Sequence, residues 1–223
     1  MTPGPATLVA LELDHVLIAV TELAAAAREI EVRHGLASIE GGRHPGWGTA
    51  NMIVPLGETY LELVAVVDEA VAARNPFGRW VAAVHPGLGR PLGWAVRTRQ
   101  LDRIAQRLGL SVRAGSRAAP GGELLRWRSA GIEQAAAEPS LPFFIDWAEG
   151  TPFPGRATAR HRVSLEITRL ELAGDAARLV GWLGNHRLPI AVHAGMPAVA
   201  SIVLKGAAGE IVLAADPSSG SDL

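Results

Sequence analysis

The sequence predicts an α+β fold in which repeated β-α-β-β-β modules form a curved mixed sheet, a half-barrel or cup, with helices outside. Two observations predict this fold. An apolar strand is followed by an amphipathic helix and three short strands, with glycine-rich or charged turns between them. The same order of elements then returns twice along the chain, as expected of an internal repeat.

The first module spans residues 9–67 and opens with a strand at residues 11–20 that is apolar on both faces, as in a buried strand. Thr21 can cap the following helix, which ends at Gly35. Three short strands complete this module, at residues 37–40, 50–56 and 59–66.

The second module spans residues 91–149 and pairs with the first, whereas the third, at residues 158–216, matches it only in the order of elements. An ordinary α+β domain with accidental periodicity is the alternative, but three copies in register favour the repeat. The remaining segments are a helical insert at 68–90, a Pro/Gly-rich linker at 150–157, a disordered lead at 1–8 and a disordered tail at 217–223.

The composition excludes several classes of function. A formal net charge of -1 provides no basic surface for nucleic acid or an anionic membrane. No apolar run approaches the roughly 20 residues that cross a bilayer, and the first residues lack the features of a signal peptide. The absence of cysteine excludes disulfides and thiol nucleophiles. We therefore expect a cytoplasmic protein that binds a small molecule, with neither nucleic acid nor membrane as a partner.

Several segments resemble a known family. The unit that opens with LDHVLIAV and closes with YLELVAV resembles the vicinal oxygen chelate superfamily, which includes glyoxalase I, extradiol dioxygenases and the fosfomycin and bleomycin resistance proteins. The stretches GGRHPGWGTAN, PLGWAVRT, LLRWRSAG and PFFIDW resemble, more narrowly, its glyoxalase-like domain branch. The resemblance covers about residues 11–155 and implies a cup around a small-molecule site, but no particular reaction.

The resemblance also implies a metal site. The superfamily's metal enzymes carry ligands on the first and last strands of two paired modules, and these positions fall on His15, Glu62 and Asp146 in this sequence. The fourth position falls on Gly93, which cannot bind metal, so this chain departs from the pattern. One imidazole and two carboxylates suit a divalent ion such as Zn, Ni, Mn or Fe, although the ion can also be absent.

Each predicted ligand has a structural alternative. His15 can be a core histidine with its hydrogen bonds satisfied. Glu62 stands among apolar neighbours, where a carboxylate costs several kcal/mol unless it is paired or metal-bound, but it can also lie at a wet rim. The same argument applies more weakly to Asp146, because its strand is short.

Further residues are candidates for substrate binding. His44 and Trp47 share a glycine-rich loop and can form one wall of the pocket, with Asn51 on the following strand. Arg126 and Arg128 point to one face of a strand and can clamp a carboxylate or phosphate if that face is concave. On the outer face they would be solvated charges.

The leading hypothesis is a glyoxalase-like enzyme of the lyase, isomerase or dioxygenase kind, in which a divalent metal polarises vicinal oxygens of a substrate that can be anionic. Glu62 would act as general base, and His44 would be a second proton-transfer group. The alternative is a metal-free binding or sequestration protein of the bleomycin-resistance type, which the glycine at position 93 favours. A homodimer is also expected, because an unpaired half-sheet exposes its edge.

Overall fold

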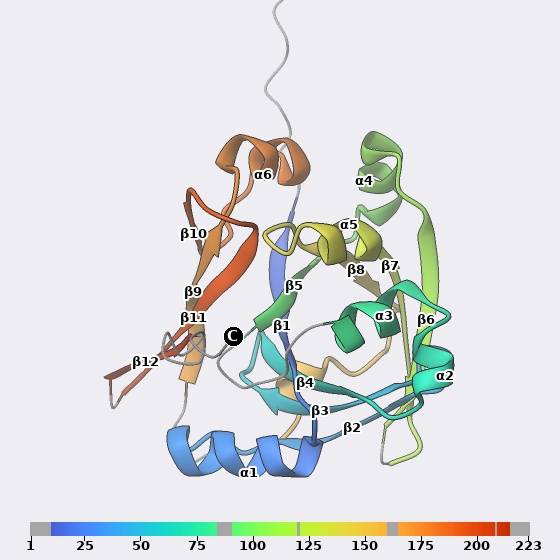
Figure 1. The fold of residues 1–223 in the computed structure, drawn as a ribbon, viewed down its shortest axis with the longest axis vertical. Helices are drawn as coiled ribbons and strands as arrows, with labels where there is room; N and C mark the ends of the chain where they lie inside the picture. The colour runs from blue at the N-terminus through green and yellow to red at the C-terminus, as the bar shows by residue number, and fades with distance from the viewer. Residues whose placement is uncertain (1–9, 84–90, 120, 160–164, 208, 215–223) are drawn as a thin grey trace, which may run out of the picture.

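The computed structural model forms an eight-stranded sheet, a four-stranded sheet and several short helices (Figure 1). None of the helices in the part described is long and apolar enough to cross a membrane. The described residues are 10–83, 91–119, 121–159, 165–207 and 209–214. Four predicted segments lie outside them: the lead at 1–8, the tail at 217–223, the end of the insert at 84–90 and the beginning of the third module's first strand, which is predicted for residues 161–172 and is described only from residue 165.

The first module begins with a strand whose side chains are almost all buried, as its apolar sequence predicts. Its helix ends where Gly35 takes a left-handed backbone with φ of 70° and donates its N–H to the carbonyl of Glu31. The elements of this module are β1 (Glu12–Ala19), α1 (Leu23–His34), β2 (Ile39–His44), β3 (Thr49–Pro55) and β4 (Tyr60–Val66).

The second module repeats this arrangement. Its last strand pairs in parallel with its first, as β4 does with β1, and the first strands of the two modules pair antiparallel. The resulting strand order is β2-β3-β4-β1-β5-β8-β7-β6, which confirms the predicted curved mixed sheet. The elements are β5 (Pro91–Arg97), α4 (Leu101–Leu108), β6 (Val112–Ala118), β7 (Leu124–Ala130) and β8 (Phe143–Trp147).

The large sheet is nearly closed. Its two edge strands, β2 and β6, lie beside each other, and the guanidinium of Arg117 on β6 donates a hydrogen bond to the carbonyl of Gly41 on β2. Each edge strand therefore faces the other instead of standing free in solvent.

Two helices close the concave side of this sheet (Figure 1). The insert forms α2 (Glu69–Ala72) and α3 (Pro76–Ala83), and α5 (Ile132–Ala137), which is not among the predicted elements, follows β7. Phe77 and Trp80 of α3 pack with Ile132 of α5 against the inward-facing residues of the sheet. The interior of the cup is therefore largely filled with side chains.

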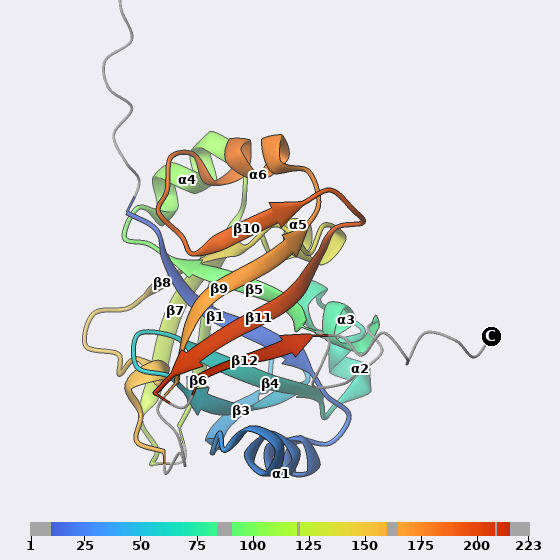
Figure 2. The same ribbon diagram turned by 90° about the vertical axis from the view of Figure 1, so that its left-hand side faces the viewer.

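The third segment forms a separate sheet that packs across the convex face of β1 and β5 (Figure 2). Leu170 and Ile202 belong to the same buried cluster as Val16 and Trp94, so one core joins the two sheets. The strand order β10-β9-β11-β12 differs from that of the first two modules, because β10 and β11 flank the first strand of the segment. The elements are β9 (Leu165–Ala173), α6 (Ala176–Leu183), β10 (Ile190–His193), β11 (Ala198–Gly206) and β12 (Gly209–Ala214).

Candidate functional site

A cavity lies inside the large sheet, between its concave face and α3. The cavity is small, with a volume of about 30 Å³. The polar side chains that line it are His15, His44, Asn51, Glu62 and Arg117. The aromatic ones are Trp47, Tyr60, Phe77, Trp127, Phe143 and Trp147. A mostly apolar hollow with a few convergent polar groups is typical of a small-molecule site.

A β-bulge shapes one wall of the cavity. The pairing of β1 with β5 shifts register between Leu13 and His15, which leaves Asp14 as the extra residue. Both Asp14 and His15 are consequently buried, and Asp14 accepts the Nδ1 proton of His15 across 2.6 Å. The indole of Trp147 donates to the other oxygen of Asp14 across 2.9 Å. The Tyr60 ring stacks on the imidazole of His15 at a centroid distance of 4.6 Å.

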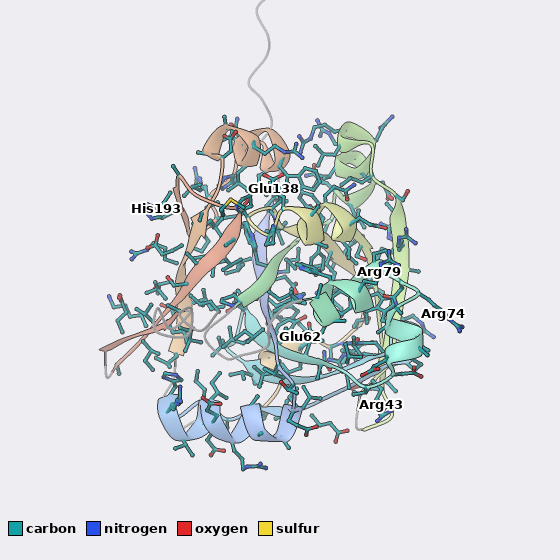
Figure 3. The ribbon with its side chains drawn as sticks, in the orientation of Figure 1. Arg43, Glu62, Arg74, Arg79, Glu138 and His193 are labelled. Atoms are coloured by element: carbon teal, nitrogen blue, oxygen red, sulfur yellow. The ribbon has the colours of Figure 1, made fainter. Side chains whose placement is uncertain are left out.

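Glu62 stands at the centre of the site, in the interior of the molecule (Figure 3). Strand β3 brings Asn51 beside it, and the Asn51 amide donates to Oε1 of Glu62 across 2.8 Å. The other oxygen, Oε2, lies 3.5 Å from Nε2 of His15. Asp14, His15 and Glu62 therefore form a continuous buried chain of acidic and basic groups.

The contact between Nε2 of His15 and Oε2 of Glu62 depends on where one proton lies. Because Nδ1 of His15 donates to Asp14, a neutral imidazole presents its Nε2 lone pair to the Glu62 carboxylate. Two lone pairs at this separation repel each other, so a proton on either Nε2 or Oε2 stabilises the pair. The arrangement can thus accept a proton at Glu62 and pass it to the imidazole.

His44 lies on another wall of the cavity and is buried. Its Nδ1 lies 3.0 Å from the hydroxyl of Thr49, and its ring centroid lies 5.4 Å from that of Trp47. Burial, with a smaller contribution from the charge of Arg117, lowers the pKa of His44 to about 4. His44 is therefore neutral near pH 7.

Tyr60 is also held in its neutral form. Burial raises the pKa of the Tyr60 hydroxyl well above its ordinary value, and the carboxylates of Asp14 and Glu62 raise it further. The phenol consequently stays protonated and adds no negative charge beside the carboxyl groups of Asp14 and Glu62.

Three of the predicted site residues lie outside the cavity. Strand β7 alternates, so that Trp127 points inward while Arg126 and Arg128 are exposed on the outer face. The carboxylate of Asp146 on β8 pairs with Arg128 across 2.8 Å and with Arg99 across 3.2 Å. Asp146 therefore belongs to an ion-pair cluster on the outer surface, which also includes Asp102.

The residues present do not fit the predicted metal site. Of the three expected ligands, His15 and Glu62 meet in the cavity but Asp146 does not. At the fourth position, a Cβ on Gly93 would meet the Trp80 ring at 2.4 Å, so an indole occupies the space where a ligand side chain would begin. Within the described ranges, no group of three His, Asp or Glu side chains is arranged to hold a metal ion.

Sequence reasoning overlooked two polar residues of the site. Asp14 sits next to His15 in an otherwise apolar strand, and two adjacent buried polar residues are a signal for a bulge. Arg117 has no such signal, because its segment, RAGSRAAP, has the composition of an exposed turn. Only the approach of β6 to β2 places Arg117 at the cavity.

The depressed pKa of His44 predicts a pH dependence of stability. Because His44 titrates at about 4 in the folded chain and near 6.5 when unfolded, the unfolded state binds the additional proton between these values. Stability contributed by neutral His44 is full above about pH 6.5 and is lost as the pH falls to about 4, on the order of 3 kcal/mol at about 1.36 kcal/mol per pH unit.

Thermal unfolding of His44→Gln and of wild type, measured from pH 7 to pH 4, checks this dependence. We expect the midpoint of the variant to fall less steeply over this range than that of wild type. Replacement of the exposed Val32 by Gln, which changes no titratable group, is the control and should leave the slope unchanged. Parallel slopes for His44→Gln and wild type would show that His44 titrates normally.

The close contact between Gly93 and Trp80 predicts that any side chain at position 93 destabilises the fold. We expect Gly93→Ala to lower the free energy of unfolding by about 1–3 kcal/mol, because the added methyl group must displace a packed indole. Gly181→Ala is the control: it lies in α6 with no atom within 4 Å of the added carbon, and should be neutral or stabilising. Equal denaturant midpoints for Gly93→Ala and wild type would contradict this packing.

Comparison with known proteins agrees with this fold. Residues 13–186 match the model of a family described as glyoxalase-like domain. A hypothetical protein from Staphylococcus aureus superposes with a TM-score of 0.70 at 16% identity, covering 88% of this chain and 92% of that one. Methylmalonyl-CoA epimerase from Mycobacterium tuberculosis gives a TM-score of 0.44 at 21% identity, covering 64% of this chain and 90% of its own.

A third structure is that of methylmalonyl-CoA epimerase from Streptomyces coelicolor in complex with 2-nitronate-propionyl-CoA. It gives a TM-score of 0.45 at 17% identity, covering 62% of this chain and 97% of that one. No curated protein matches the sequence. With the family model covering most of its length, the chain belongs to the glyoxalase-like domain family.

Proposed function

We propose that the protein is a small-molecule enzyme that moves a proton at a carbon atom next to a carbonyl group, with Glu62 as the general base. The observation that carries this proposal is the position of the Glu62 carboxylate, which lines the cavity between the Asn51 amide and the imidazole of His15. A buried carboxylate that lines a cavity and is held in place by a neighbouring amide is suited to act as a general base.

In the proposed step, Oε2 of Glu62 takes the proton from the substrate carbon, and the C–H electron pair moves into the carbonyl group to give an enolate. The proton then returns to the same or the neighbouring carbon, which makes the reaction an isomerisation. If a leaving group departs from the next carbon instead, the reaction is a lyase reaction. The Asn51 amide and His15 hold the carboxylate in position during the transfer.

His44 can donate a hydrogen bond to the carbonyl oxygen of the substrate in the same step. When the Thr49 hydroxyl donates to Nδ1 of His44, the neutral imidazole keeps its proton on Nε2 and can donate it to the developing enolate oxygen. The aromatic rings around the cavity exclude water, which strengthens such a hydrogen bond.

The proposed step uses only the chain's own groups. The version expected from the resemblance, with a divalent ion between His15, Glu62 and Asp146, requires a carboxylate that instead pairs with Arg128 and Arg99. The cytoplasmic location stays a prediction from the sequence. So does the homodimer, although the sheet edges β2 and β6 that would motivate it lie against each other.

A binding or sequestration protein is the second candidate function. The observation that favours it is the aromatic lining, because six rings around a small hollow suit a planar ligand whether or not it reacts. Trp80 over Gly93 also removes one position at which the superfamily's metal enzymes place a ligand.

Proton exchange with solvent tests the enzyme directly. We expect the protein, incubated in D₂O with small 2-oxo acids, 2-oxo aldehydes and hydroxy ketones, to erase the proton NMR signal next to the carbonyl group of at least one compound. Glu62→Gln should lower the exchange rate by about 100-fold or more, because it removes the base and keeps the shape. Asp146→Asn, on the outer surface, should exchange as wild type does.

Two outcomes would count against proton transfer by Glu62. One is equal exchange by Glu62→Gln and wild type. The other is binding of these compounds without exchange of any of them, which would support sequestration. Treatment with a chelator should leave the exchange rate unchanged. If exchange instead stops in the chelator and returns when a divalent metal is added, the metal-assisted reaction is favoured.

A further inference from the structure

Arg117 is a buried cation that lacks a close anionic partner. Its side chain lines the cavity, only 6% of its surface is exposed, and its guanidinium donates to the carbonyl of Gly41. In the described ranges no carboxylate lies within ion-pair distance of Arg117, and Glu62, which faces the same cavity, is farther than 4.0 Å. A buried charge without a paired counter-charge is costly, so an anion placed beside Arg117 would stabilise it.

Other arginines of the chain show the contrast. Arg97, Arg128 and Arg156 each pair with a carboxylate, and all three are more exposed than Arg117. The guanidinium of Arg117 instead acts on the cavity, because its charge helps to lower the pKa of His44. The only fully buried guanidinium of this set is therefore the one directed at the candidate site.

A second unsatisfied group lies close to Arg117. Oδ1 of Asn51 is buried and has no hydrogen-bond partner among the described residues. It lies against Gly41, where a Cβ would meet it at 2.1 Å, and the carbonyl of Gly41 is the group that Arg117 binds. A guanidinium that lacks an anion and an amide oxygen that lacks a donor thus both lie against Gly41.

Arg117 also lines a groove on the outer surface of the molecule. Its charged lining residues are Arg117, Arg156, Glu40 and Glu123, and its apolar ones include Ile39, Ile53, Leu125 and Phe153. Because Arg117 lines both the groove and the inner cavity, it stands between them. An anion bound in the groove can therefore contact the same guanidinium that lines the inner cavity.

We propose that Arg117 binds the carboxylate of a small 2-oxo or 2-hydroxy acid, whose hydroxyl or enol group donates to Oδ1 of Asn51. The planar guanidinium can hold a carboxylate through two parallel hydrogen bonds, and the amide oxygen can accept from the hydroxyl of a 2-hydroxy acid or from the enol form of a 2-oxo acid. The carbon chain of the acid then extends toward Glu62. This assignment of the substrate class rests on the proposed function in one respect, which is that the carbon next to the carbonyl group lies at the carboxylate of Glu62.

Quenching of tryptophan fluorescence measures this binding, because Trp47, Trp127 and Trp147 line the cavity. We expect pyruvate to quench the emission saturably and its neutral counterpart pyruvamide to bind at least about tenfold more weakly, since the amide lacks the charge. Lactate should bind more tightly than propionate, because only lactate carries a donor for Asn51. Equal responses to pyruvate and pyruvamide, or none to either, would overturn the assignment.

Variants identify the residue. Arg117→Gln should weaken pyruvate binding by about tenfold or more, whereas Arg126→Gln, which removes an exposed arginine from the neighbouring strand, should bind as wild type does. If Arg117→Gln fails to fold, Arg117→Lys decides: it keeps the charge and loses the planar fork, so binding should weaken while the preference for pyruvate over pyruvamide persists. Unchanged binding by the folded Arg117 variant would refute the proposal.

The exchange and binding measurements separate the two proposals. Charge-selective pyruvate binding that depends on Arg117, without any proton exchange, would support the anion site and contradict proton transfer by Glu62. Exchange that depends on Glu62 but not on Arg117 would support the base and contradict the anion site.

Discussion

The site depends on two carboxylates buried inside an apolar barrel. Neither Asp14 nor Glu62 can remain there without hydrogen bonds, because a carboxylate removed from water costs several kcal/mol when it is unpaired. The fold satisfies Asp14 with His15 and the indole of Trp147, and Glu62 with Asn51 and His15. Strands from both modules contribute these partners, so the pairing of the modules and the chemistry of the cavity depend on each other.

The curved sheet of this chain encloses a cavity that is filled mainly by aromatic side chains and not by metal ligands. The insert between the modules places α3 over the concave side, and Trp80 packs on the bare backbone of Gly93. The aromatic filling leaves little free space, which suits a small ligand and keeps water away from Glu62. On the convex side the third segment covers β1 and β5, so the central strands are buried on both faces.

The fold could be predicted from the sequence because periodicity and glycine stops report backbone structure directly. Five candidate residues meet in the cavity: His15 and Glu62, which the family resemblance implied, and His44, Trp47 and Asn51, which a glycine-rich loop and the strand after it suggested. Asp146 lies outside the cavity. The sequence did not reveal this, because its strand has only five residues and so short a pattern does not show which face of the sheet a side chain is on. Arg117 could not be found, since only the closure of the sheet, a long-range contact, brings it to the site.

The protonation of His15 tests the account most directly, because the chain from Asp14 to Glu62 fixes which ring nitrogen carries the proton. Nitrogen NMR of the ¹⁵N-labelled imidazoles in wild type and Glu62→Gln reports it. The account predicts a protonated Nδ1 in both proteins and an Nε2 resonance of His15 that shifts in the variant. An unprotonated Nδ1, or an Nε2 resonance that does not respond to Glu62→Gln, would contradict it.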